Sequence, residues 1–162
     1  MMNSSKMHSS RAFTFVEAVF TIAIIGIMAA LAITAISNGA RDANRIVARQ
    51  QQAAIQEALH AWVMSQTRVG NTAQLQTIGS IRTEYNKLTT TSARFEKLKP
   101  DLQNSDPTKR AGFLDSTTVE HFESYQTSTD RLQSAALAGA SQYLTLPDWE
   151  DGDMPRVVLK DE

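Results

Sequence analysis

Residues 13–36 read FTFVEAVFTIAIIGIMAALAITAI, and Glu17 is the only ionisable side chain among these 24 residues. As an α-helix rising about 1.5 Å per residue, the segment is about 36 Å long, enough to cross a hydrocarbon core of about 30 Å. Its alanines and Gly26 are small residues that allow a second helix to approach closely inside a bilayer. The stretch therefore predicts a transmembrane helix that also packs against other helices.

Glu17 is a residue that an ordinary membrane anchor lacks. A carboxylate at the centre of a spanning helix costs about 2.5–3.5 kcal/mol on insertion scales, and less nearer the interface. Two interpretations are open. Either Glu17 reaches the head groups or is protonated, or it meets a cation, of which a free amine is the simplest.

The segment before the span, MMNSSKMHSSRA at residues 1–12, is polar and has no apolar periodicity, so it is interpreted as a leader without folded structure. It contains two basic residues, and three more, Arg41, Arg45 and Arg49, follow the span. The distribution of basic residues on the two sides therefore does not fix the orientation of the helix.

The residues that carry a family resemblance are 12–17, AFTFVE, and 24–33, IIGIMAALAI. They resemble the N-terminus of type IV pilins and of the pseudopilins of type II secretion systems. The resemblance implies a cytoplasmic leader, cleavage between Ala12 and Phe13 by a membrane peptidase, N-methylation of Phe13, and Glu17 as the self-assembly residue. Two positions depart from the family pattern, which usually has Gly in place of Ala12 and often Pro in place of Thr34.

The implied processing has a physical rationale. After cleavage, the ammonium of Phe13 and the carboxylate of Glu17 are opposite charges in a medium of low dielectric constant, and each is costly to bury alone. Glu17 of one subunit can pair with the Phe13 amine of a neighbour. Because an unpaired charge is strongly disfavoured, this pairing would reject subunits in the wrong register.

An ordinary export signal is a competing interpretation of the apolar segment. Ala30, Leu31 and Ala32 would then form the small-residue site, with cleavage before Ile33. The apolar run is too long for such a signal, which usually has about 7–15 apolar residues, and export signals have no reason to contain Glu17.

Residues 40–67 contain neither Pro nor Gly and are rich in Ala, Gln and Arg, a composition that favours helix. Ile55, Leu59 and Trp62 are spaced to lie on one helix face. We expect this face to form the core of the chain's own globular part. The alternative is that part of it packs against neighbouring stalks in a filament, and both can hold at different heights along the helix. One helix over 13–67 is predicted.

The remainder of the chain predicts an α+β head over residues 70–162, beginning after the helix stop at Gly70 and Asn71. The expected elements are one or two short helices within 72–99, a turn at 104–107, a helix from Thr117 or Thr118 to about Leu137, and an antiparallel pair formed by 142–146 and 156–159. The predicted regions are thus a leader at 1–12, a transmembrane helix at 13–36, a periplasmic continuation of the stalk at 37–69, and the head.

Four acidic side chains crowd into one turn of the head: Asp148, Glu150, Asp151 and Asp153. Calcium requires several oxygen ligands brought together by a loop, and some secretion pseudopilins have a C-terminal calcium loop, so calcium is the expected ion if this turn binds one. A solvated acidic turn is the alternative. The three histidines, His8, His60 and His121, have no metal-site spacing.

No catalytic motif or phosphate-binding loop occurs, the chain has no cysteine, and we do not expect an enzyme. The sequence predicts a structural subunit of a pilin-like filament, most simply a type II secretion pseudopilin in the bacterial inner membrane with a periplasmic head. Its expected partners are copies of itself or other pilin-like subunits, a prepilin peptidase, an inner-membrane assembly platform and membrane lipid.

Two alternatives remain open. One is a type IV pilus or DNA-uptake pilin, although nucleic acid is not an expected partner because residues 70–162 contain ten Lys and Arg against fourteen Asp and Glu. The other is a membrane-tethered binding module that does not assemble, for which Glu17 would be dispensable.

Overall fold

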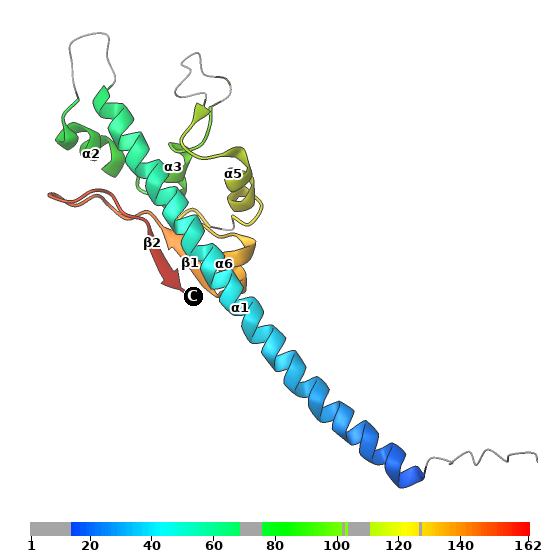
Figure 1. Ribbon diagram of the computed structural model, residues 1–162. Coiled ribbons are helices and arrows are strands. Elements are labelled where there is room, and N and C mark those ends of the chain that lie inside the picture. Colours follow the sequence, from blue (N-terminus) through cyan, green and yellow to red (C-terminus); the bar gives the residue numbers. More distant parts are fainter. Residues whose placement is uncertain (1–13, 69–75, 102, 104–110, 127) are drawn as a thin grey trace, which may run out of the picture. The chain divides into compact units, whose positions relative to one another are not determined.

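The computed structural model describes residues 14–68, 76–101, 103, 111–126 and 128–162. The chain divides into two compact units, Met1–Ala40 and Arg41–Glu162. The helices and strands, in chain order, are α1 (Phe15–Arg68), α2 (Ile78–Asn86), α3 (Thr91–Glu96), α5 (Ser116–Glu123), α6 (Ala135–Gly139), β1 (Gln142–Thr145) and β2 (Val158–Asp161) (Figure 1). A long N-terminal helix, short helices and a C-terminal antiparallel pair confirm the predicted α+β class.

The predicted stalk helix is present as α1, which contains 54 residues. Its end at Arg68 lies one residue beyond the predicted end, and its start at Phe15 lies two residues after the predicted start. Phe13 itself lies outside the described residues, as do Gly70 and Asn71, the predicted helix stop.

The first part of α1 exposes its apolar side chains. Twelve large hydrophobic side chains between residues 15 and 36 are at least 45% exposed. They are Phe15, Val16, Val19, Phe20, Ile22, Ile24, Ile25, Ile27, Met28, Leu31, Ile33 and Ile36. A surface of this kind is not stable in water, because soluble monomers rarely expose large contiguous apolar patches.

The second part of α1 supplies the central face of a hydrophobic core. Its buried residues are Ala48, Ile55, Ala58, Leu59, Trp62 and Val63. The core is completed by Ile81 and Tyr85 of α2, Phe95 of α3, Val119 and Phe122 of α5, Leu137 of α6, Leu144 of β1, and further residues of the connecting segments. The prediction that Ile55, Leu59 and Trp62 face the head's own core is therefore confirmed.

Side-chain caps define where the four short helices in the described part of the chain begin. Each is preceded by a Thr, Asp or Ser whose side-chain oxygen accepts a hydrogen bond from a backbone N–H in the first turn, which satisfies a donor that the helix itself leaves free. The caps are Thr77 for α2, Thr90 for α3, Asp115 for α5 and Ser134 for α6. The two helices in residues 72–99 agree with the prediction.

The prediction of one helix from Thr117 or Thr118 to Leu137 is wrong. Helix α5 starts earlier, because Asp115 rather than a threonine caps it, and ends at Glu123. Leu132 then lies in an extended segment that exchanges two backbone hydrogen bonds with Leu144, at 2.8 and 3.0 Å. A helix through this position would lose both bonds, so the chain re-enters helix only at α6.

The two strands pair antiparallel, with Leu144 opposite Leu159 and Thr145 opposite Val158. This confirms the predicted antiparallel pair, although β2 runs two residues beyond the predicted end. The predicted turn at 104–107 lies outside the described residues.

Gly112 allows the chain after α3 to fold back closely. Its φ is +65°, and a Cβ at this position would lie 2.4 Å from the backbone nitrogen of Pro100. The approach is secured by hydrogen bonds from the N–H groups of Phe113 and Leu114 to the carbonyl oxygen of Leu98, at 2.9 and 3.1 Å.

We predict that Gly112→Ala lowers the free energy of unfolding by about 1–3 kcal/mol through backbone strain alone, and by more because of the clash with Pro100. Urea denaturation in mild detergent, followed by the fluorescence of Trp62 and Trp149, measures this. Gly152→Ala is the matched control, since Gly152 also has a positive φ of +86° but faces open space. An equal decrease in the free energy of unfolding in Gly112→Ala and Gly152→Ala would contradict the role assigned to the close packing of Gly112 against Pro100.

Candidate functional site

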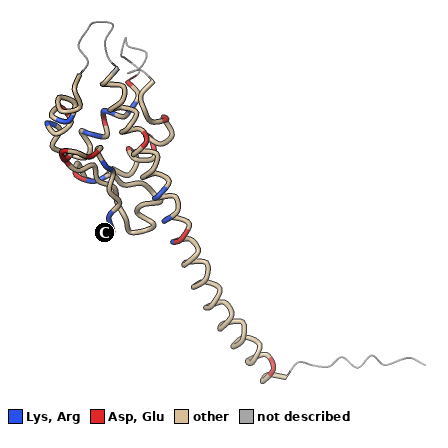
Figure 2. The backbone as a smooth tube through the Cα atoms, turned by 60° about the vertical axis from the view of Figure 1, so that its left-hand side comes forward, with Lys and Arg blue, Asp and Glu red and all other residues tan. Residues whose placement is uncertain are grey.

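Glu17 lies in the first turn of α1 and is exposed, surrounded along the helix by the exposed apolar side chains. It is the only charged residue of α1 before Arg41, and Figure 2 shows the first part of the long helix as almost entirely uncharged. Ala12 and Phe13, the predicted processing residues, lie outside the described residues. The structure thus places the predicted acid on an accessible apolar helix.

Thr14 caps α1, a role that was not predicted from the sequence. Its Oγ1 accepts a hydrogen bond from the backbone N–H of Glu17 at 3.3 Å. Thr14 and Glu17 have the spacing of a capping box, in which an acid or amide at the third helical position supports the cap. The signal that could have revealed it is the sequence Thr-x-x-Glu at the start of an apolar run. This spacing makes Glu17 a candidate for a local capping role, while its role in assembly stays a prediction.

Among the described residues, α1 is the one helix whose length and composition suffice to cross a membrane. The most apolar window of this helix has no buried residues, so it does not have the environment of a core helix in a soluble domain.

The C-terminal loop, defined as residues 146–157 between β1 and β2, contains the acidic turn and is held by side chains of other elements. Asn86 at the end of α2 binds Trp149 twice, donating to its carbonyl oxygen at 3.0 Å and accepting from its N–H at 2.8 Å. The Trp149 indole N–H in turn donates to the carbonyl oxygen of Asp153 at 2.5 Å. The buried indole thereby fixes the conformation of the acidic turn.

Two glutamines of α1 bind the end of the same loop. Gln56 donates to the carbonyl oxygen of Pro155 at 2.9 Å and accepts from the N–H of Val157 at 2.7 Å. Gln52 donates to the carbonyl oxygen of Val157 at 2.9 Å. Because backbone groups near the core need partners, these amides allow an irregular segment to run alongside α1.

Arg94 of α3 secures the start of the loop from inside the core. Its side chain is 3% exposed, donates to the carbonyl oxygen of Leu146 at 2.5 Å, and forms an ion pair with Asp148. Its guanidinium carbon lies 4.8 Å from the centre of the Tyr85 ring. Burial raises the pKa of Tyr85 to about 12, and the neutral ring faces the cation with its π-electrons.

Three of the four acidic side chains predicted as calcium ligands bind arginines instead of converging. The ion pairs are Arg94–Asp148, Arg82–Asp151 and Arg156–Asp153, the last at 2.9 Å. The hydrogen bond from Arg82 holds the pKa of the Asp151 carboxyl below its ordinary value. The fourth acid, Glu150, is exposed.

This arrangement does not fit a calcium ion. Calcium takes about six to eight oxygen ligands, whereas no group of three or more His, Asp or Glu side chains in the described part of the chain is placed to hold a metal. The calcium site stays a prediction that this geometry does not support.

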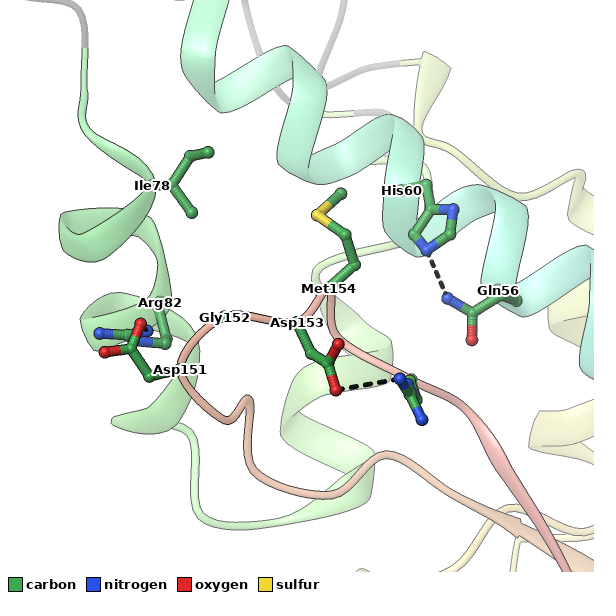
Figure 3. A pocket seen from close by; sticks show the side chains of 9 residues that line it. Gln56, His60, Ile78, Arg82, Asp151, Gly152, Asp153 and Met154 are labelled. Atoms are coloured by element: carbon green, nitrogen blue, oxygen red, sulfur yellow. Dashed lines mark hydrogen bonds and ion pairs between the residues drawn. The ribbon is translucent and has the colours of Figure 1, made fainter.

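A groove of about 690 Å³ lies between α1, α2 and the C-terminal loop (Figure 3). Its lining includes His60, Ile78, Met154 and two of the arginine–aspartate pairs. Gln56 Nε2 lies 2.7 Å from His60 Nε2, so this imidazole nitrogen accepts a hydrogen bond from the amide that also binds the loop. The polar groups of the groove largely bind one another and hold the loop.

Comparisons of the chain with family models, with curated proteins and with solved structures found no match.

We predict that calcium leaves the thermal stability of the head unchanged. At about 10 mM, calcium bound with a Kd of about 1 mM would stabilise the fold by about 1.4 kcal/mol and raise the melting temperature by several degrees. Magnesium at the same concentration controls for ionic strength. A rise specific to calcium that Asp153→Asn abolishes would show that the arginine pairs open to admit the ion.

Proposed function

We propose that this chain is a structural subunit of a pilin-like filament, most simply a pseudopilin of a type II secretion-like system. The observation that carries the proposal is a single carboxylate, Glu17, on an exposed apolar helix that is long enough to cross a membrane. An assembly through such a helix gives its apolar side chains an alternative to lipid, and gives the carboxylate an alternative to an unfavourable position inside the bilayer.

The pairing partner in this proposal is the N-terminal ammonium of a neighbouring subunit. A peptidase first removes residues 1–12, and Phe13 becomes the methylated N-terminus. The Phe13 ammonium and the Glu17 carboxylate of adjacent subunits then neutralise each other inside the helix bundle. Each charge is costly without the other, so the pair selects one register even where it adds little net stability.

The proposal places the subunit in the inner membrane with its head in the periplasm. Its partners are then copies of itself or related subunits, the processing peptidase and an inner-membrane assembly platform. The head is held to α1 in part by Gln52 and Gln56, which bind its irregular C-terminal loop at 2.7–2.9 Å.

The intact mass of the protein extracted from membranes tests the processing step. We expect a mass lacking residues 1–12 and carrying one additional methyl group, and the full-length mass when the peptidase is absent. A full-length mass in cells that contain the peptidase would contradict the proposal, and loss of all residues through Ala32 would instead support an export signal.

Glu17→Gln tests the pairing without removing the helix cap, because a capping box accepts Gln as well as Glu. We predict normal membrane insertion but at least about a hundredfold less incorporation into sedimentable filaments, since an unpaired buried ammonium costs about 3–5 kcal/mol. Sheared filaments are sedimented and quantified by immunoblot, which gives the ratio of filament-incorporated to membrane-bound subunit.

Asp42→Asn is the matched control, because it removes a negative charge from an exposed position of the same helix outside the apolar segment. This variant should assemble like the wild type. Wild-type incorporation of Glu17→Gln would exclude the ion pair and leave the cap as the role of Glu17.

A further inference from the structure

A stripe of arginines follows the apolar segment of α1. Arg41, Arg45 and Arg49 recur every four residues, which places them within about 80° of one another around the helix. All three are exposed. Arg41 lies only five positions after Ile36, the last large apolar side chain of the segment.

The charge of this stripe is largely uncompensated within the chain. In the described part of the protein, its one ion pair joins Arg45 to Asp42 at 3.6 Å, with side chains 58% and 72% exposed. Exposed pairs of this kind contribute little, and Arg41 and Arg49 have no ion-pair partner among the described residues. Three arginines and one aspartate leave a local charge of about +2.

The neighbouring surface of the head does not neutralise the stripe. Helix α6 packs beside α1 near the stripe, since a Cβ on Gly139 would lie 2.2 Å from the side-chain nitrogen of Asn44. Residues 131–147, which contain α6 and β1, include no Asp or Glu. The two acids that end the chain are engaged elsewhere, because Gln142 binds Asp161 and Arg131 binds Glu162, at 2.9 and 3.0 Å.

The spacing fits the head-group layer of a bilayer. Five residues of helix rise about 7.5 Å, comparable with the layer of about 5–7 Å outside the hydrocarbon core. Helical side chains tilt toward the N-terminus, so the long arginines lean back toward the span. Ile46, which is 60% exposed between them, adds the apolar contact typical of interfacial helices.

We propose that Arg41, Arg45 and Arg49 bind the phosphate groups of anionic phospholipids where α1 leaves the bilayer. The planar guanidinium group can donate two parallel hydrogen bonds to a phosphate, and a surface of like-charged lipids complements a stripe of cations. This site rests on the proposed membrane-spanning function of α1. It would hold the subunit at a defined depth before assembly.

The test uses the chain without residues 1–12, extracted from membranes and placed in phosphatidylcholine vesicles that contain spin-labelled phosphatidylglycerol or spin-labelled phosphatidylcholine. Electron paramagnetic resonance measures the fraction of each label immobilised by the protein. We expect preferential association of phosphatidylglycerol that weakens in about 0.5 M NaCl. Each arginine should increase the preference for phosphatidylglycerol over phosphatidylcholine by up to about fivefold. The double variant Arg41→Gln and Arg49→Gln should therefore lose most of this preference.

Arg156→Gln is the matched control, because it removes the same charge from an exposed position in the C-terminal loop and should retain the preference. An unchanged preference in the double variant overturns the site. Equal immobilisation of phosphatidylglycerol and phosphatidylcholine by the wild-type protein also overturns it, and inorganic phosphate bound under those conditions would assign the stripe to soluble phosphate.

The same measurement separates this site from the assembly role of Glu17. Glu17→Gln should keep the lipid preference even where it abolishes assembly. If neither lipid is immobilised by the wild-type protein, α1 does not enter the bilayer, and both the arginine site and the proposed function fail.

Discussion

The exposed apolar side chains of the first part of α1 are the constraint on which the rest of the account depends. Twelve large hydrophobic side chains cannot remain in water, and the head's hydrophobic core lies within residues 41–162 and buries none of them. These side chains must contact lipid, or other helices, or first lipid and then other helices. Glu17 makes the choice more specific, because a carboxylate among these side chains is tolerated only where a cation, a proton or the interface is available.

The second part of α1 has the same helical periodicity but a different role, because one of its faces is buried in the core of the head. Its buried face, centred on Ile55 and Leu59, organises short helices that have little stability of their own. Without disulfides, the irregular C-terminal loop is held by side chains that satisfy its backbone. Asn86 binds Trp149 and Gln56 binds Pro155 and Val157, so core packing and loop conformation depend on each other.

Strong periodicity made most of the fold predictable from the sequence. The apolar run, the stripe containing Trp62 and the β-prone segments near the C-terminus each indicated their element directly. The helix expected to reach Leu137 failed because pattern reasoning does not detect the non-local bridge between Leu132 and Leu144. Short capped helices such as α6 depend on the tertiary context rather than on local propensity.

The candidate site was predictable only in part. Glu17 was identified because its charge conflicts with its apolar neighbours, whereas the cap from Thr14 was overlooked beside that stronger signal. The acidic turn resembled a cation site in sequence. Its arginine partners come from positions as distant as Arg82 and Arg94, and no local motif reveals such pairing.

The most direct test of the central claim is a distance across the subunit interface. Filaments grown from a mixture of subunits, half with a ¹⁵N-labelled Phe13 amine and half with a ¹³C-labelled Glu17 carboxyl, can be measured by solid-state NMR dipolar recoupling. The account predicts an intermolecular contact within about 4 Å, the limit for an ion pair, in the mixed filaments. Dephasing no greater than in filaments labelled with ¹³C alone would contradict it.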